Sequence, residues 1–218
     1  MGNRAVIVGK ESDFGIYLQW NGGRDSVEAF LEYSRLKGHP GIVGSGDGIF
    51  ALSTIITNFF GKHGYYVRPM KGDEAREARI WDNGIYIVEG NEIIEPRIWD
   101  NGIYIVEGNE IIERRSFEGK EQDDYELIDM LKRIDAAQPA EYQLGEEFIE
   151  AEEIPLDDLQ IGDRYMEIDP VYGKVVKRTI VGKNKRGPYT DRYPNRDNPN
   201  QFDWNIENYP EGIVRLVK

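Results

Sequence analysis

The sequence predicts an α+β protein in which an antiparallel β-meander packs with two to three helices, followed by a small β-rich C-terminal domain. Three observations lead to this prediction. Short apolar, β-rich segments alternate with turn residues, and apolar residues recur at helical spacing in three other segments. Segments 79–96 and 97–114 form an uninterrupted tandem repeat. The predicted domains span residues 1–137 and 138–218.

The first 40 residues predict a β-hairpin followed by a helix. Segments 4–9 and 15–20 are short and apolar, and the polar tetrapeptide KESD separates them. Asp25 and Glu28 have capping-box spacing, so Asp25 is predicted to cap a helix that begins near Ser26. A glycine and a proline at 38 and 40 are expected to end this helix.

Two further helices and a set of short strands follow. Isoleucine, leucine and phenylalanine recur at helical spacing over 49–60, and a similar stripe predicts a helix over about 122–136. The stretch AAQPAEYQLGEE then resembles a linker. Beyond it, short strands bounded by turn residues are predicted at 148–154, 165–168, 174–181 and 212–217.

The two copies of the repeat share the sequence RIWDNGIYIVEGNEIIE and differ only in their last position, where Pro96 corresponds to Arg114. Identity without drift indicates a recent or deliberate duplication. Each copy holds two strand segments and two turn dipeptides, Asn-Gly and Gly-Asn. Two added strands restore the direction of the chain, so a meander is expected to absorb both copies, with Ile85 and Ile87 on the same face as Ile103 and Ile105. In the alternative, one copy pairs in the sheet and the other forms a protruding hairpin.

The composition limits the chemistry that is available. The chain has no cysteine and two histidines, so thiol chemistry is excluded and little material exists for histidine-based metal or triad sites. We therefore expect no metal, no cofactor and no catalytic residue, and the sequence favours a role that is not enzymatic. No apolar run approaches the roughly 18 residues of a spanning helix. A cytoplasmic protein without a membrane partner is the simplest expectation, and the oligomeric state stays open.

The net charge of −13 conceals two opposite stretches. Residues 121–170 hold 17 acidic and three basic residues, whereas residues 171–196 hold eight basic residues and one acidic residue. The acidic stretch predicts binding to a cationic protein groove through Glu146, Glu147, Glu150, Glu152, Glu153, Asp157 and Asp158. The basic, aromatic stretch predicts contact with DNA or RNA through Lys183, Lys185, Arg186, Tyr189 and Arg192. In the alternative, the two stretches neutralise each other within one domain.

A glycine turn before the first helix predicts a second kind of site. The segment YLQWNGGRDSVEAF is similar to the phosphate loop of the ATP pyrophosphatase family, Ser-Gly-Gly-x-Asp-Ser. The resemblance implies phosphate binding by Gly22, Gly23, Arg24, Asp25 and Ser26, because a glycine turn and a helix N-terminus present backbone N–H groups. Asn21 replaces the first serine, and the preceding strands predict a hairpin instead of a parallel sheet. In the alternative, the motif is a turn and a helix cap.

The segments NRAVIV, GIYLQWNGGRDSVEAFLEY and WDNGIYIVEGNEII resemble small uncharacterised proteins of phages and mobile elements. Some proteins of that genomic setting are anti-CRISPR inhibitors. The resemblance implies a non-enzymatic inhibitor of a host defence nuclease, with Cas9 as the leading target, that acts in the host cytoplasm. It covers about half of the chain and transfers no functional residues. The ATP-binding enzyme and the nucleic-acid-binding module remain as alternatives.

Overall fold

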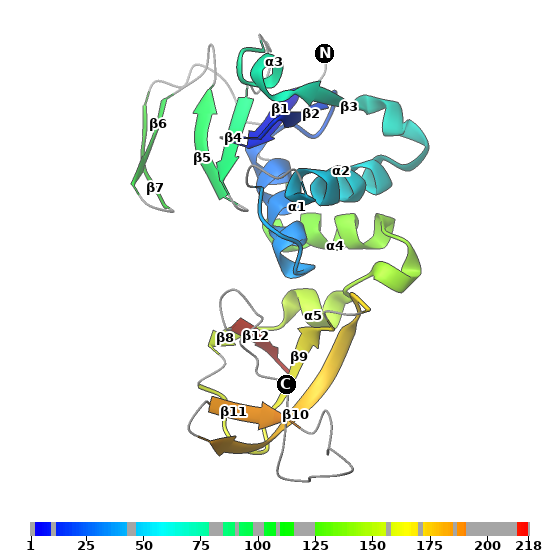
Figure 1. Ribbon diagram of the computed structural model, residues 1–218, viewed down its shortest axis with the longest axis vertical. Coiled ribbons are helices and arrows are strands. Elements are labelled where there is room, and N and C mark those ends of the chain that lie inside the picture. Colours follow the sequence, from blue (N-terminus) through cyan, green and yellow to red (C-terminus); the bar gives the residue numbers. More distant parts are fainter. Residues whose placement is uncertain are drawn as a thin grey trace. The chain divides into compact units, whose positions relative to one another are not determined.

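The computed structural model divides into two compact units, Met1–Ala140 and Glu141–Lys218 (Figure 1). It describes residues 3–9, 12–42, 47–78, 85–89, 92–97, 103–107, 110–115, 125–155, 158–169, 172–184, 187–190 and 213–217. Helices and largely antiparallel sheets occur in the same chain, so the predicted α+β class is confirmed. The division at residue 140 lies close to the predicted boundary at residue 137. That the two parts fold independently stays a prediction.

The N-terminal unit is built on a five-stranded sheet with the order β3-β2-β1-β4-β5. The predicted hairpin is confirmed, because β1 (Ala5–Gly9) pairs antiparallel with β2 (Phe14–Leu18). Strand β3 (Val67–Lys71) pairs antiparallel with β2 at one edge. On the other side, β1 pairs in parallel with β4 (Ile85–Glu89), which forms an antiparallel hairpin with β5 (Glu92–Arg97).

Helices cover both faces of this sheet. Figure 1 shows the short α3 (Gly72–Arg76) on one side and α1 (Arg24–Leu36) and α2 (Asp47–Phe60) on the other. The 3-10 helix η1 (Gly61–Tyr66) joins α2 to β3, and α4 (Leu127–Ala137) packs against α1 and α2. Phe30, Leu52 and Ile134 are fully buried among these helices. The prediction of two further helices is confirmed, although α4 begins at residue 127 instead of about 122, and residues 122–124 lie outside the described residues.

The predicted start of the first helix is wrong. Gly23 is the N-cap of α1, no side chain caps the helix, and Asp25 lies in the first turn. The Asp25 carboxylate instead accepts hydrogen bonds from the backbone N–H of Ser26 at 2.6 Å and of Tyr125 at 3.2 Å. The helix dipole favours a carboxylate in the first turn. An acidic residue at the start of this helix was therefore predicted correctly, whereas its position as the N-cap was not.

The expectation that the sheet takes in both copies of the repeat is also wrong. The first copy enters the sheet as β4 and β5, whereas β6 (Ile103–Glu107) and β7 (Glu110–Arg115) of the second copy form a separate two-stranded sheet. Strand β6 contacts β5, and Figure 1 shows the second hairpin beside the first. The alternative hypothesis, a hairpin outside the sheet, therefore describes the second copy. The Asn-Gly and Gly-Asn dipeptides lie outside the described residues.

The C-terminal unit contains a second five-stranded sheet, with the order β11-β10-β9-β12-β8 and antiparallel pairing throughout. Leu159, Tyr165 and Ile180 form its buried core. The strands are β8 (Glu153–Pro155), β9 (Arg164–Ile168), β10 (Val175–Asn184), β11 (Gly187–Thr190) and β12 (Ile213–Leu216). The predicted strands over 165–168, 174–181 and 212–217 are confirmed as β9, β10 and β12.

The predicted strand over 148–154 is wrong in its first half. The chain forms the 3-10 helix η2 (Ala140–Tyr142) and then α5 (Glu146–Glu150), and β8 begins at Glu153. Phe148 and Ile149 are adjacent and both buried, at 5% and 0% exposure. A strand would send these neighbours to opposite faces, whereas a short helix turns both inward.

Candidate functional site

The α5 helix presents carboxylates along the surface of the C-terminal unit. Gly145, at φ 83°, turns the chain into the helix in a conformation that favours glycine. Burial of Phe148 and Ile149 then fixes which face of α5 points inward. Among the acidic residues predicted to bind a partner, the structure leaves exposed Glu146, Glu147, Glu150, Glu152 and Asp158. Asp157 lies outside the described residues.

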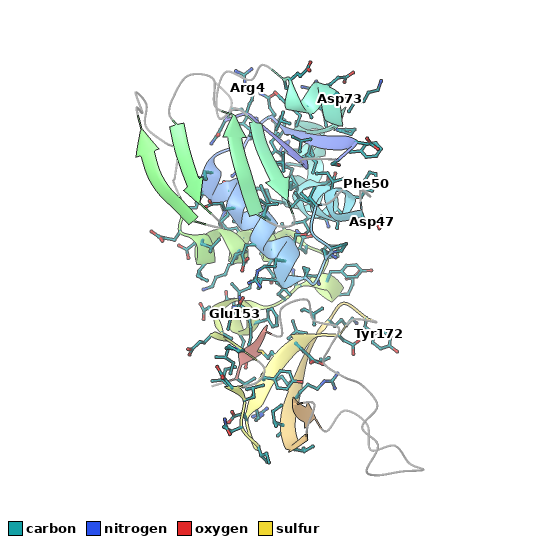
Figure 2. The ribbon with its side chains drawn as sticks, turned by 60° about the vertical axis from the view of Figure 1, so that its left-hand side comes forward. Arg4, Asp47, Phe50, Asp73, Glu153 and Tyr172 are labelled. Carbon is teal, nitrogen blue, oxygen red and sulfur yellow. The ribbon has the colours of Figure 1, made fainter. Side chains whose placement is uncertain are left out.

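Glu153 was predicted to belong to the same surface, but the structure places it in an ion pair within the fold. Its carboxylate pairs with the guanidinium of Arg215 on β12, and Figure 2 shows Glu153 next to that strand. The same guanidinium donates to the carbonyl oxygens of Phe148, Ile149 and Ala151 at 3.1, 2.8 and 2.7 Å. Arg215 thus caps the C-terminal end of α5, where carbonyl groups lack helical partners. The sequence offered no signal for this role, because 62 residues separate Arg215 from Glu153.

Opposite charges do meet within the C-terminal unit. The ammonium of Lys177 lies 2.7 Å from both carboxylate oxygens of Glu147, and both side chains are about half exposed. Arg178 donates to Glu167 at 3.0 Å and lies 3.6 Å from Asp169, both of which are nearly buried. Two cations of the basic stretch are therefore neutralised by the acidic stretch, as the mutual-neutralisation alternative expected.

The predicted nucleic-acid site is described only in part. Lys183 lies on β10 and Tyr189 lies on β11, and these strands form an antiparallel hairpin in which Asn184 pairs with Gly187. Lys185, Arg186 and Arg192 lie outside the described residues. Contact with DNA or RNA through this hairpin stays a prediction.

The glycine turn at 21–26 packs tightly against β1. The N–H of Gly22 donates to the carbonyl of Asn3 at 2.9 Å, and a Cβ atom on Gly22 would lie 2.6 Å from the Cβ of Ala5. Asn21 lies at φ 53° and its side chain donates to the Ser26 hydroxyl at 3.4 Å, while Arg24 pairs with Glu28 at 2.5 Å. Gly23 is buried at the N-cap of α1. These contacts give each residue of the motif a role within the fold, and phosphate binding there stays a prediction.

A buried polar cluster joins α1 to α4, and the sequence analysis did not identify it. The Tyr33 hydroxyl donates to a carboxylate oxygen of Asp135 at 2.7 Å, and both side chains are buried. Burial, followed by the bond to Asp135 and its charge, raises the pKa of Tyr33 above its ordinary value. Burial lowers the pKa of Lys37, and the nearby Asp135 partly opposes that shift. Burial, followed by the charge of Lys37, lowers the pKa of His39.

Gln138 at the end of α4 extends this connection to α2. Its side-chain amide donates to the carbonyls of Ile55 and Ile134 at 3.2 and 3.0 Å and accepts from Asn58 at 2.9 Å. The spacing of apolar residues predicts the stripe of α4 that faces inward but does not indicate which polar residues of the helix are buried. We interpret this cluster as structural, because its hydrogen bonds connect three helices.

The described residues contain no group of three or more histidine or acidic side chains arranged to hold a metal ion. None of the described helices is long and apolar enough to cross a membrane. No protein-family model, curated protein or solved structure matches the chain. The exposed carboxylates on and after α5 form the candidate binding surface among the described residues.

Proposed function

We propose that this protein is a non-enzymatic binding protein that inhibits a host defence nuclease, using the acidic surface of α5 to occupy a cationic groove of its partner. The observation that carries the proposal is the exposure of several carboxylates on one short segment of the C-terminal unit. We define the acidic surface of α5 by the exposed residues Glu146, Glu147 and Glu150 of the helix together with Glu152 and Asp158, which follow it in the chain.

The arrangement of charge on α5 favours a cationic partner. Glu146 and Glu150 are four residues apart in the helix, so they share a face, and like charges at this spacing destabilise an isolated helix by a few tenths of a kcal/mol. Lysine or arginine side chains of a partner relieve this repulsion. Glu146 also lies in the first turn of α5, where the helix dipole favours a carboxylate, so the proposal depends on the exposure of these carboxylates and not on the repulsion between them.

The ion pair between Glu147 and Lys177 does not close the surface to a partner. Both side chains are about half exposed, and exposed ion pairs contribute roughly 0–1 kcal/mol. A guanidinium that approaches Glu147 with better geometry replaces Lys177 at small cost, because arginine presents two parallel donors to a carboxylate.

An exposed aromatic side chain lies in the segment that leads into α5. Tyr142 is 52% exposed and follows Glu141, which is also exposed. Tyrosine is enriched among the residues that dominate binding energy at interfaces, and surrounding charges mainly set orientation and association rate. We therefore assign Tyr142 to the centre of the contact and the carboxylates to its rim.

Two arguments favour a nuclease as the partner: the positive charge of a nucleic-acid-binding groove, and the resemblance of the sequence to phage and mobile-element proteins. A nuclease that binds nucleic acid has a groove lined with lysine and arginine, and a surface of exposed carboxylates competes for it. The loose likeness to phage and mobile-element proteins favours a CRISPR nuclease, with Cas9 first, and implies action in the host cytoplasm.

The test is DNA cleavage by guide-loaded Cas9 in the presence of increasing amounts of the full chain. The proposal predicts inhibition that saturates near one inhibitor per nuclease and weakens when Cas9 is first assembled on its DNA. The Glu146→Gln/Glu150→Gln/Glu152→Gln variant is expected to inhibit at least tenfold less. Full inhibition by this variant, or no inhibition by the wild type, would contradict the proposal for this nuclease.

The matched control removes three exposed carboxylates from the N-terminal unit, in a Glu74→Gln/Glu77→Gln/Glu126→Gln variant. It changes the net charge by the same amount as the α5 variant. The proposal predicts inhibition like that of the wild type, because these residues lie outside the acidic surface. Equal loss in both variants would indicate an effect of overall charge instead of a defined surface.

A further inference from the structure

One edge of β1 pairs with a short strand from the first copy of the repeat. β1 pairs in parallel with β4 through four register positions, in which Val6, Ile7, Val8 and Gly9 pair with Ile85, Tyr86, Ile87 and Val88. Val6, Ile7 and Val8 are fully buried. The segment that binds this edge is thus an Ile-Tyr-Ile-Val strand that belongs to a hairpin.

The chain contains a second segment with the same properties. Strand β6 carries Ile-Tyr-Ile-Val at 103–106, and it pairs with β7 in the register that β4 adopts with β5. Both hairpins shift register at the same place, between Ile87 and Val88 and between Ile105 and Val106. Within the paired strands the two copies differ only where Pro96 of the first copy corresponds to Arg114 of the second. Proline on a strand at a sheet edge is tolerated, so this difference changes the binding segment little.

We propose that the edge of β1 is a binding site that either copy of the repeat occupies, so that the two hairpins exchange at β1 within one chain. In the first state β4 and β5 lie in the sheet, as observed. In the second state β6 and β7 take their place, and the first copy forms the separate hairpin. The proposal is independent of the proposed function.

The connections permit both states at nearly equal cost. With the first copy at β1, the short segment 77–84 leads from α3 to the sheet and the long segment 98–126 leads from it to α4. With the second copy at β1, the long segment 77–102 connects α3 to the sheet, and the short segment 116–126 connects the sheet to α4. The entropic cost of closing each loop grows with the logarithm of its length, so the ratio of the two populations depends on the product of the two loop lengths in each state. This ratio favours the first state by a factor of only about 1.4.

The shorter outgoing connection, 116–126, is long enough for the second state. An extended segment of this length spans about 36 Å. Both β5 and α4 contact α1, so the two positions that the connection joins lie against the same helix. Exchange requires that the bound hairpin leave β1, which is a local opening and not unfolding of the unit.

Placing a charge in register with buried Val8 gives the first test. If the hairpins exchange, Ile87→Asp removes one of two folded states that are nearly equally populated. The folded-to-unfolded equilibrium constant is then expected to fall about twofold. Ile105→Asp is expected to have the same small effect. The double variant loses both states, and its equilibrium constant is expected to fall at least 100-fold, because an unpaired charge in register with the fully buried Val8 is strongly destabilising. A 100-fold loss from Ile87→Asp alone, measured by urea unfolding, would overturn the proposal.

Cysteine cross-linking reports the states directly, because the chain contains no cysteine of its own. The Val8→Cys/Ile87→Cys/Ile105→Cys variant is equilibrated in a glutathione redox buffer, alkylated and digested with trypsin. The copies are distinguishable, since peptide 80–97 contains Pro96 and peptide 98–114 does not. We expect both peptides linked to the β1 peptide within the same chain, in yields that differ by less than tenfold.

The control replaces Ile105→Cys by Tyr104→Cys, a neighbouring position that a strand directs to the opposite face. Its link to Val8→Cys is expected to be at least tenfold weaker. Equal links from positions 104 and 105 would indicate random collision and overturn the proposal. Links from β1 to the first copy alone would do so too, as would links to the second copy found only between two chains.

Discussion

Replacing Tyr33 by phenylalanine is expected to destabilise the N-terminal unit by about 2 kcal/mol. The Tyr33 hydroxyl donates at 2.7 Å to the Asp135 carboxylate, and the exposures of the two side chains are 0% and 6%. Hydrogen bonds to charged groups contribute roughly 1.5–3 kcal/mol, and the substitution leaves the ring in place, so no large cavity adds to the loss. The matching fall in melting temperature is about 4–8 °C.

Urea unfolding at neutral pH measures this loss, with Tyr17→Phe as the control. The Tyr17 hydroxyl also donates at 2.7 Å, but its acceptor is the neutral, partly exposed amide oxygen of Gln19. That bond is expected to contribute under about 1 kcal/mol. If Tyr33→Phe and Tyr17→Phe cost the same, burial of the bond to Asp135 is not the source of its strength, and the reasoning fails.

The pH dependence gives an independent check on Tyr33. Its pKa is raised in the folded state, so its contribution is fully present below the unfolded value of about 10 and is lost as pH rises above it. The stability difference between wild type and Tyr33→Phe should therefore shrink above pH 10, by about 1.4 kcal/mol per pH unit. A difference that stays constant up to pH 11.5 would refute the assignment.

Three further predictions concern other parts of the chain. Burial lowers the pKa of Lys37 in the folded state, so stability is gained as pH rises from the folded pKa towards the unfolded value of about 10.4. Urea unfolding of Lys37→Met at increasing pH should lack that gain. Arg215→Ala should destabilise the C-terminal unit by about 3 kcal/mol, because three carbonyls and the Glu153 carboxylate lose their donor, and thermal unfolding of Arg215→Lys should show a smaller loss. Gly22→Ala should destabilise the N-terminal unit by about 2 kcal/mol or more in urea unfolding, since its Cβ would lie 2.7 Å from the backbone nitrogen of Ala5. An alanine that is tolerated there would mean that the turn does not depend on close approach to β1.

Local patterns in the sequence predicted the elements well where one side-chain rule governs the element. The hairpin of β1 and β2 and the apolar stripe of α2 followed from alternation and from helical spacing. The start of α1 did not, because an acidic pair three residues apart is compatible both with a capping box and with two positions inside the helix, and Asp25 in fact lies in the first turn after the N-cap Gly23. The backbone N–H of Tyr125, 100 residues away, contacts Asp25, and no local rule contains that information.

Position in the sheet was harder to predict than strand formation. Each repeat copy forms a hairpin, as its turn dipeptides indicate, yet one copy joins the sheet and the other does not. The two copies have the same Ile-Tyr-Ile-Val strand, so a rule applied to each copy separately cannot predict which of them pairs with β1. The acidic surface was found from composition alone, but the separation of Glu153 from the other carboxylates required Arg215, which lies far along the chain.

The affinity of the full chain for guide-loaded Cas9, measured as a function of salt, tests whether the acidic surface binds a cationic groove. If exposed carboxylates on α5 bind a cationic groove, affinity should fall steeply between about 50 and 500 mM salt, because screening shortens the range of these interactions. The α5 triple variant should bind at least tenfold more weakly at low salt and with a flatter dependence, while the N-terminal control variant matches the wild type. Binding that is insensitive to both salt and the α5 substitutions would show that these carboxylates do not bind a cationic groove of Cas9.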